Sequence, residues 1–124
     1  MRKADVQETP TLFAIVHRAA EVCDPDGNQD GASALLERFE DRDEPVGEPA
    51  VAEQEIAEAK GAVDPQDEDP VATMAAAVAT YLAYRRTELD RDRLELLVLA
   101  ARAEFDGRPP EPVASWLAEQ GVEL

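Results

Sequence analysis

One stretch of the chain has oxygen-bearing side chains at the spacing of a calcium-binding loop. Residues 26–31 read DGNQDG and Glu37 follows six residues later, which fits the pattern D-x-[DN]-x-[DN]-G-x5-E. Calcium takes about six to eight oxygen ligands, which such a loop supplies from alternating short side chains, a backbone carbonyl and a bidentate Glu. The predicted ligands are Asp26, Asn28, Asp30, the carbonyl oxygen of Ala32, and Glu37.

The same residues also fit a plain polar connection between two helices. Ser33 stands where an aliphatic residue usually joins two paired loops, and Pro25 stands where an apolar side chain usually ends the incoming helix. We find no second loop of this pattern in the chain. In this alternative, Asp30 caps the following helix and Glu37 lies on its solvent face. Ca²⁺ is therefore the single cofactor that the sequence suggests, and a chain without any cofactor is the competing interpretation.

A group of arginines falls where two long helices are expected to be joined. These residues can receive the acidic part of the same chain, of a second copy or of an acidic partner. The alternative is a solvated charged turn with weak local pairs to Glu88, Asp90 and Asp92. The candidate interaction residues are Arg85, Arg86, Arg91 and Arg93.

Residues that commonly carry catalysis are scarce. His17 is the single histidine and Cys23 is the single cysteine. Cys23 ends a predicted helix, where the helix dipole disfavours a thiolate. The chain has no glycine-rich phosphate loop, no G-x-S-x-G and no HExxH. We therefore predict a protein that is not an enzyme.

Acidic residues dominate the charge of the chain. It carries 28 acidic and 12 basic residues, a formal charge of −16, and 12 of the acids with two bases fall in residues 40–69. This balance argues against direct contact with nucleic acid or with anionic membranes, both of which require a basic surface. A basic protein partner is the natural complement. A weaker alternative is that the acidic segment mimics nucleic acid and occupies a basic partner's site.

The spacing of apolar residues predicts helices throughout and no sheet. We predict an all-α, single-domain bundle of five to six helices over residues 1–124, built around an αα-hairpin at about 70–106. A first helix should begin near Thr9-Pro10 and stop near Cys23. Others should cover 32–41 and 49–60, the latter ending at Gly61. Residues 40–69 should pack loosely, with 61–69 the part most prone to disorder.

The predicted hairpin should form the stable centre of the protein. Its first helix begins after Asp69-Pro70, a cap followed by proline at the first helical position. Leu97 lies on the seam and within an apolar run, so we expect it to be fully buried. The two apolar stripes are Val71, Met74, Val78 and Tyr81 on the first helix, with Leu82 beside them, and Leu94, Leu97, Val98, Ala101 and Phe105 on the second, which Leu96 and Leu99 widen.

Function and location follow from composition alone. A lone cysteine favours a reducing compartment, and we find neither a secretory leader nor a segment long enough to span a bilayer. We expect a cytoplasmic protein that acts through a protein partner or as a regulator. A second copy of the same chain, in a homodimer, is one candidate partner. Calcium binding at residues 26–37 is the alternative function.

Overall fold

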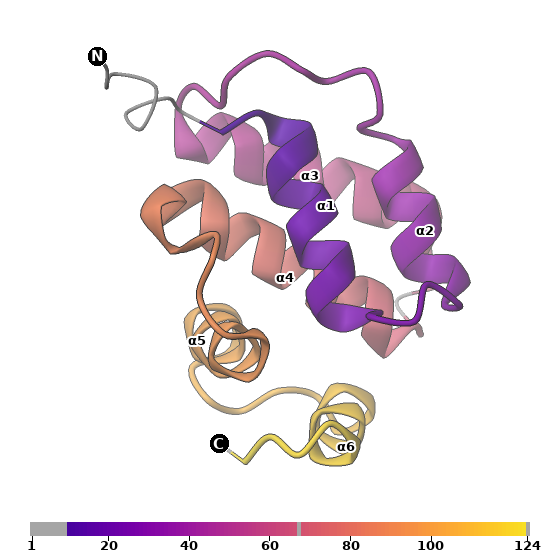
Figure 1. The fold of residues 1–124 in the computed structure, drawn as a ribbon. Coiled ribbons are helices and arrows are strands. Elements are labelled where there is room, and N and C mark those ends of the chain that lie inside the picture. Colours follow the sequence, from indigo (N-terminus) through magenta and orange to yellow (C-terminus); the bar gives the residue numbers. More distant parts are fainter. Residues whose placement is uncertain (1–9, 67, 124) are drawn as a thin grey trace.

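The computed structural model describes residues 10–66 and 68–123, and over these residues the chain is all-α. The predicted helical bundle is confirmed, with six α-helices and one 3-10 helix in the described part of the chain (Figure 1). The elements are α1 (Leu12–Cys23), α2 (Asp30–Glu37), α3 (Pro49–Val63), α4 (Pro70–Tyr84), η2 (Arg86–Glu88), α5 (Arg93–Phe105) and α6 (Glu111–Glu119).

Helix α4 lies at the centre, and α1, α3 and α5 all pack against it (Figure 1). Nine of its fifteen residues are buried, and most of these are alanines. Small side chains allow neighbouring helices to approach closely on several sides. Its start follows the prediction, because Asp69 accepts a hydrogen bond from the Val71 N–H at 2.9 Å and Pro70 occupies the first turn.

Helix α1 begins later than predicted. Thr11 is its N-cap, and the Thr11 hydroxyl accepts a hydrogen bond from the Ala14 N–H at 3.0 Å. Pro10 therefore lies outside the helix and not at its first position, while Thr9 lies outside the described residues. Threonine is a good N-cap, and its position directly before Leu12 fixes where α1 begins. The apolar face of the helix packs on α4. The buried residues of that face are Leu12, Ile15, Val16, Ala19, Val22 and Cys23.

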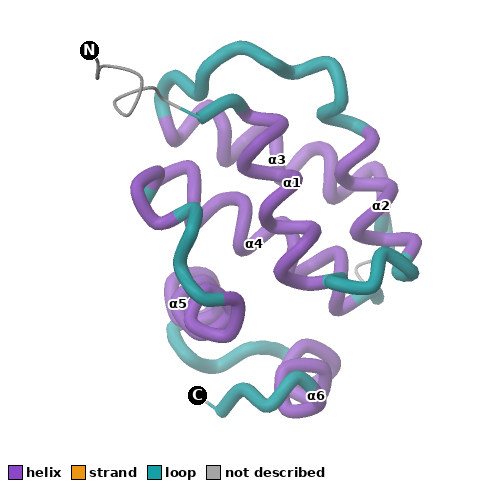
Figure 2. The backbone as a smooth tube through the Cα atoms, in the orientation of Figure 1, coloured by secondary structure: helices purple, strands orange, loops and turns teal. Residues whose placement is uncertain are grey.

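The connection from α2 to α3 runs as a long loop along the top of the bundle (Figure 2). We expected this acidic region to pack loosely. Its backbone forms hydrogen bonds to the start of α1, from the Val46 N–H to Pro10 at 3.0 Å and from the Phe13 N–H to Arg42 at 3.0 Å. Val46 is buried. Since the first N–H groups of a helix have no partner within it, this loop supplies acceptors for α1.

Helix α3 continues through Gly61, so the prediction that Gly61 ends it is wrong. It reaches Val63, and the N–H of Asp64 donates to the Lys60 carbonyl at 2.8 Å. Glycine weakens a helix by only about 1 kcal/mol relative to alanine. Burial of Ala52, Ile56 and Ala59 against the rest of the core is enough to offset that.

Helix α5 turns inward a face that overlaps the predicted one only in part. Leu97 is fully buried as expected, and so is Leu96, which was expected to widen the stripe, but Leu94 is 38% exposed. The inward face is Leu96, Leu97, Ala100 and Ala101. In Figure 1, α5 is seen nearly end-on while α4 lies across the view, so the two helices cross at a large angle. Helix α6 then adds Val113, Trp116 and Leu117 to the core.

Candidate functional site

The loop after α1 is organised by a carboxylate that the calcium pattern does not include. Asp24 is 8% exposed, and its two carboxylate oxygens accept the N–H groups of Asn28 at 3.1 Å and Gln29 at 2.9 Å. Helix α2 starts at Asp30, and no side chain caps it. The prediction that Asp30 caps this helix is therefore wrong. The reason is that Asp24 already holds the backbone of the turn.

The predicted calcium ligands stay spread over the loop and the helix that follows it. Asp26, Asn28, Asp30 and Glu37 are exposed, and Ala32 is buried. Within residues 10–66 and 68–123, no three His, Cys, Asp or Glu side chains gather so that they could hold a metal ion. The arrangement of the loop is thus explained by the hydrogen bonds from its backbone N–H groups to the carboxylate of Asp24. Calcium binding at this loop stays an untested alternative, which a calcium titration can decide.

The same pair of hydrogen bonds recurs where α3 is joined to α4, and this repetition was not predicted from the sequence. Asp64 accepts the N–H groups of Glu68 at 3.1 Å and Asp69 at 2.9 Å. The available signal was the dipeptide Asp-Pro directly after a helix, at 24–25 and again at 64–65; a third Asp-Pro, at 69–70, starts α4 instead. The starts of α2 and α4 lie close together, because a Cβ atom added to Gly31 would lie 2.0 Å from a carboxylate oxygen of Asp69. Gly31 therefore allows the start of α2 to approach the N-cap of α4.

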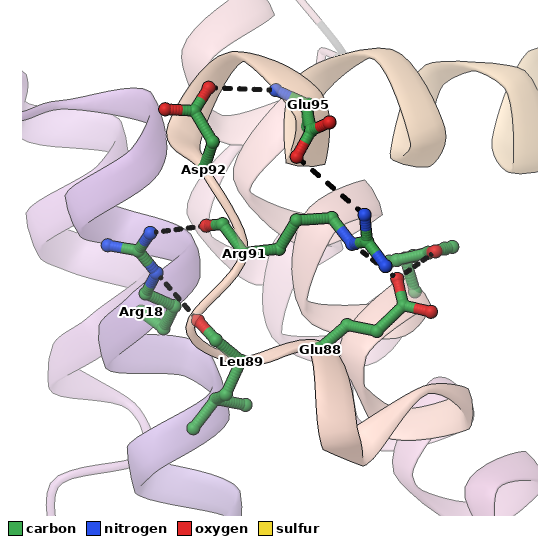
Figure 3. A network of polar contacts seen from close by, with 7 residues as sticks. Arg18, Glu88, Leu89, Arg91, Asp92 and Glu95 are labelled. Atoms are coloured by element: carbon green, nitrogen blue, oxygen red, sulfur yellow. Dashed lines mark hydrogen bonds and ion pairs between the residues drawn. The ribbon is translucent and has the colours of Figure 1, made fainter.

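Three of the four predicted interaction arginines make contacts within the protein. Arg86 donates to the Gly47 carbonyl at 2.7 Å, which lies in the acidic segment. Arg91 pairs with Glu88 at 3.1 Å and with Glu95 at 3.7 Å (Figure 3). These contacts stabilise the joint between α4 and α5.

The third of these, Arg93, reaches the end of another helix. It donates to the Val22 carbonyl at 2.6 Å and to the side chain of Gln120. The carbonyls of the last turn of α1 lack partners within that helix, and a cation there also interacts favourably with the negative end of the helix dipole. Arg93 thus links α1, α5 and the segment after α6. Arg85, the fourth arginine, is exposed.

Arg18 of α1 is a further structural arginine that the sequence analysis did not identify. Its guanidinium donates to the carbonyls of Leu89 and Arg91, both at 2.9 Å (Figure 3). Two of the carbonyls in the link before α5 are therefore satisfied by α1. No sequence signal predicts this contact, because the partners are more than seventy residues away and are backbone atoms.

Between α3 and α5 lies an open groove whose floor is α4. We call it the α3/α5 groove. Two adjoining hollows of about 420 Å³ and 240 Å³ share Glu53, Ala77, Thr80 and Glu104, so they form one continuous surface feature. Its other lining residues include Ile56, Ala57, Lys60, Thr73, Ala76, Tyr81, Tyr84, Arg85, Ala103 and Phe105.

Aromatic side chains are concentrated in this groove. The whole chain has three Phe, two Tyr and one Trp. Three of these six, Tyr81, Tyr84 and Phe105, line the groove, and Tyr84 is 51% exposed. Exposed aromatic residues are enriched where proteins bind partners. Tyr81 and Phe105 lie on the apolar stripes predicted from the sequence, and both pack against the core while staying partly exposed.

The groove holds two carboxylates on opposite walls. The Tyr84 hydroxyl donates a hydrogen bond to Glu53 of α3 at 2.8 Å. Across the groove, loss of solvent raises the pKa of Glu104 of α5, and the negative charge of Glu53 raises it further. Lys60 also lines the groove, and its ammonium group lies 3.6 Å from Asp64. The middle of the groove is therefore negative.

Catalytic groups are not gathered at this groove. Its lining contains carboxylates, hydroxyls and two cations, without histidine or cysteine. Elsewhere, Cys23 is buried, and burial raises the pKa of its thiol far above the usual range. His17 is exposed, and its ring lies against that of Phe13 in a tilted arrangement, with ring centroids 5.6 Å apart.

Comparisons with known proteins identify no family for this chain. None of the helices in the described residues is both long and apolar enough to cross a membrane. Searches against protein-family models, curated proteins and solved structures found no match to this chain.

Proposed function

We propose that this chain is a non-enzymatic binding protein that recognises a protein partner through the α3/α5 groove. The observation that carries the proposal is the gathering of three of the six aromatic side chains in one open groove. A chain with so few aromatic residues would be more stable if these side chains were buried in its core than if they were exposed. Tyr84 is instead half exposed.

The floor of the groove supports the same proposal. Thr73, Ala76, Ala77 and Thr80 follow one another along one side of α4 at helical spacing. Small side chains there leave room for the side chains of a partner between α3 and α5. This resembles in principle the recognition of a helix in a groove, where a few apolar anchors give most of the affinity.

Capture from native lysate tests this proposal if it is combined with a substitution that fills the groove. Thr80→Trp places a large uncharged side chain on the groove floor. Ala118→Trp places the same side chain on an exposed position of α6 and serves as the matched control. A photo-cross-linking residue at Ala57, which lines the groove, identifies the protein that contacts it.

The expected result is one captured protein that cross-links from position 57, is lost with Thr80→Trp and is retained with Ala118→Trp. Circular dichroism of both variants establishes that they stay folded. If every captured protein is retained equally by the two variants, the groove is not the binding site.

A further inference from the structure

The chemistry of the partner can be inferred from the charges of the α3/α5 groove, on the assumption that the proposed function holds. Glu53 and Glu104 come from different helices and line the same central part of the groove. Among the described residues, neither carboxylate forms an ion pair with an arginine or lysine, and Glu53 accepts its hydrogen bond from a neutral tyrosine. Two like charges face one another there without a neutralising side chain.

The other charged groups of the groove do not compensate for this pair. Lys60 lies at the end of the groove near Thr73, next to Asp64. Arg85 lies at the opposite end, beside Tyr84. A cation that enters between Glu53 and Glu104, which are both exposed, would interact with two carboxylates at once and would therefore be attracted more strongly than by either one alone.

The protein as a whole favours the approach of a positively charged partner. Its formal charge is −16, and complementary charge speeds the encounter of two proteins and selects between partners. The apolar part of the groove, with Phe105 and the row of small residues on α4, needs apolar side chains. One partner type meets both requirements, a helix with an apolar stripe that is flanked by basic residues.

We propose that the α3/α5 groove takes a basic amphipathic helix of a protein partner. A lysine or arginine of that helix lies between Glu53 and Glu104, and its apolar side chains lie on the small residues of α4 from Thr73 to Thr80. Tyr84 orients Glu53 toward the cation through the hydrogen bond from its hydroxyl.

Two fluorescently labelled synthetic peptides of about fourteen residues, roughly four helical turns, are the probes. Both carry leucine and alanine on one face; one has arginine beside this stripe and the other has glutamate at the same positions. Binding to the full chain is measured by fluorescence anisotropy. The test variant is Glu53→Gln with Glu104→Gln. The control is Glu58→Gln with Glu119→Gln, which removes the same charge from exposed positions outside the groove.

The arginine peptide should bind and the glutamate peptide should not. The groove variant should weaken binding of the arginine peptide by about tenfold or more, which corresponds to the loss of one good charge contact, while the control variant stays within about twofold. An equal loss in both variants would mean general attraction to an acidic surface and would overturn the inference, as would no loss in either or no binding to the wild type. If Thr80→Trp still abolishes partner capture in that case, the groove binds a partner of other chemistry and the proposed function stands.

Discussion

Asp64 has the same role at the end of α3 that Asp24 has at the end of α1. In each case the backbone N–H of the aspartate donates to the carbonyl four residues earlier at 2.8 Å, and its carboxylate accepts the N–H groups four and five residues later. The two helix–loop–helix units therefore share one local device. Asp64 differs in having Lys60 3.6 Å from its carboxylate.

This difference predicts a specific dependence of stability on pH. Burial by itself would raise the pKa of Asp64, but the two backbone N–H groups and Lys60 outweigh it and hold the pKa below its ordinary value. A lowered pKa adds stability above the unfolded pKa of about 4, and this stability is lost as the pH falls through the folded pKa. Asp64→Asn should lower Tm at pH 7, and the deficit should shrink below about pH 4.

Thermal unfolding of both proteins between neutral and acidic pH measures this effect. Asp26→Asn is the control, because Asp26 is exposed on the first loop and should change Tm little at any pH. A deficit for Asp64→Asn that stays constant across the whole range would show that its charge is not the source of the stability.

Two leucines of α5 provide a matched test of how the helix packs. Leu97 is fully buried and Leu94 is 38% exposed. Leu97→Ala should cost about 2–5 kcal/mol in the free energy of unfolding, because it removes buried methyl groups and leaves a cavity. Leu94→Ala should cost less than about 1 kcal/mol. Urea unfolding of both variants gives the values, and comparable losses would mean that α5 is turned differently on α4.

The carboxylate on the α5 wall of the groove should reduce stability in the absence of a partner. The pKa of Glu104 is raised by loss of solvent and by Glu53, so its ionised form disfavours folding at pH values above the folded pKa. Glu104→Gln should therefore raise Tm at pH 7, and this gain should vanish at acidic pH, where both states are protonated. Glu119→Gln, at an exposed position of α6, is the comparison. A lower Tm for Glu104→Gln would mean that the carboxylate is favourably bound.

Salt should stabilise the whole protein. The formal charge of −16 gives net repulsion between exposed carboxylates, and salt screens such repulsion over about 10 Å at 0.1 M. We expect Tm to rise from low to molar NaCl. Potassium glutamate at equal ionic strength controls for effects specific to chloride. An unchanged or lower Tm would indicate that the acids are mainly engaged in favourable pairs, as Glu55 is with Arg42 at 2.9 Å.

Calcium titration tests the alternative function. The carboxylates of the first loop are exposed and do not gather around a point in the described part of the chain, so we expect no binding tighter than about millimolar. Isothermal titration calorimetry with CaCl₂, on the wild type and on Glu37→Gln, is the measurement. Calcium heat at micromolar affinity that disappears in Glu37→Gln would establish the site and contradict this prediction.

Local patterns in the sequence were enough to predict the all-α type of the fold and the approximate places of α1 to α5. Helix formation depends on spacing, caps and breakers within a few residues, as at Asp69-Pro70. Full burial of Leu97 could be predicted for the same reason, because it lies in a long apolar run. Where a local signal was weak, as with Gly61, packing elsewhere overrode it.

The groove depended on tertiary structure alone. Glu53 and Glu104 are far apart in the sequence, and they face each other only because α3 and α5 both pack on α4 and leave a space between them. The same holds for Leu94 and Leu96, whose exposure depends on how α5 is rotated against its neighbour. Apolar periodicity shows that a helix has a buried side, but the rotation and crossing angle follow from how the side chains of two helices interlock.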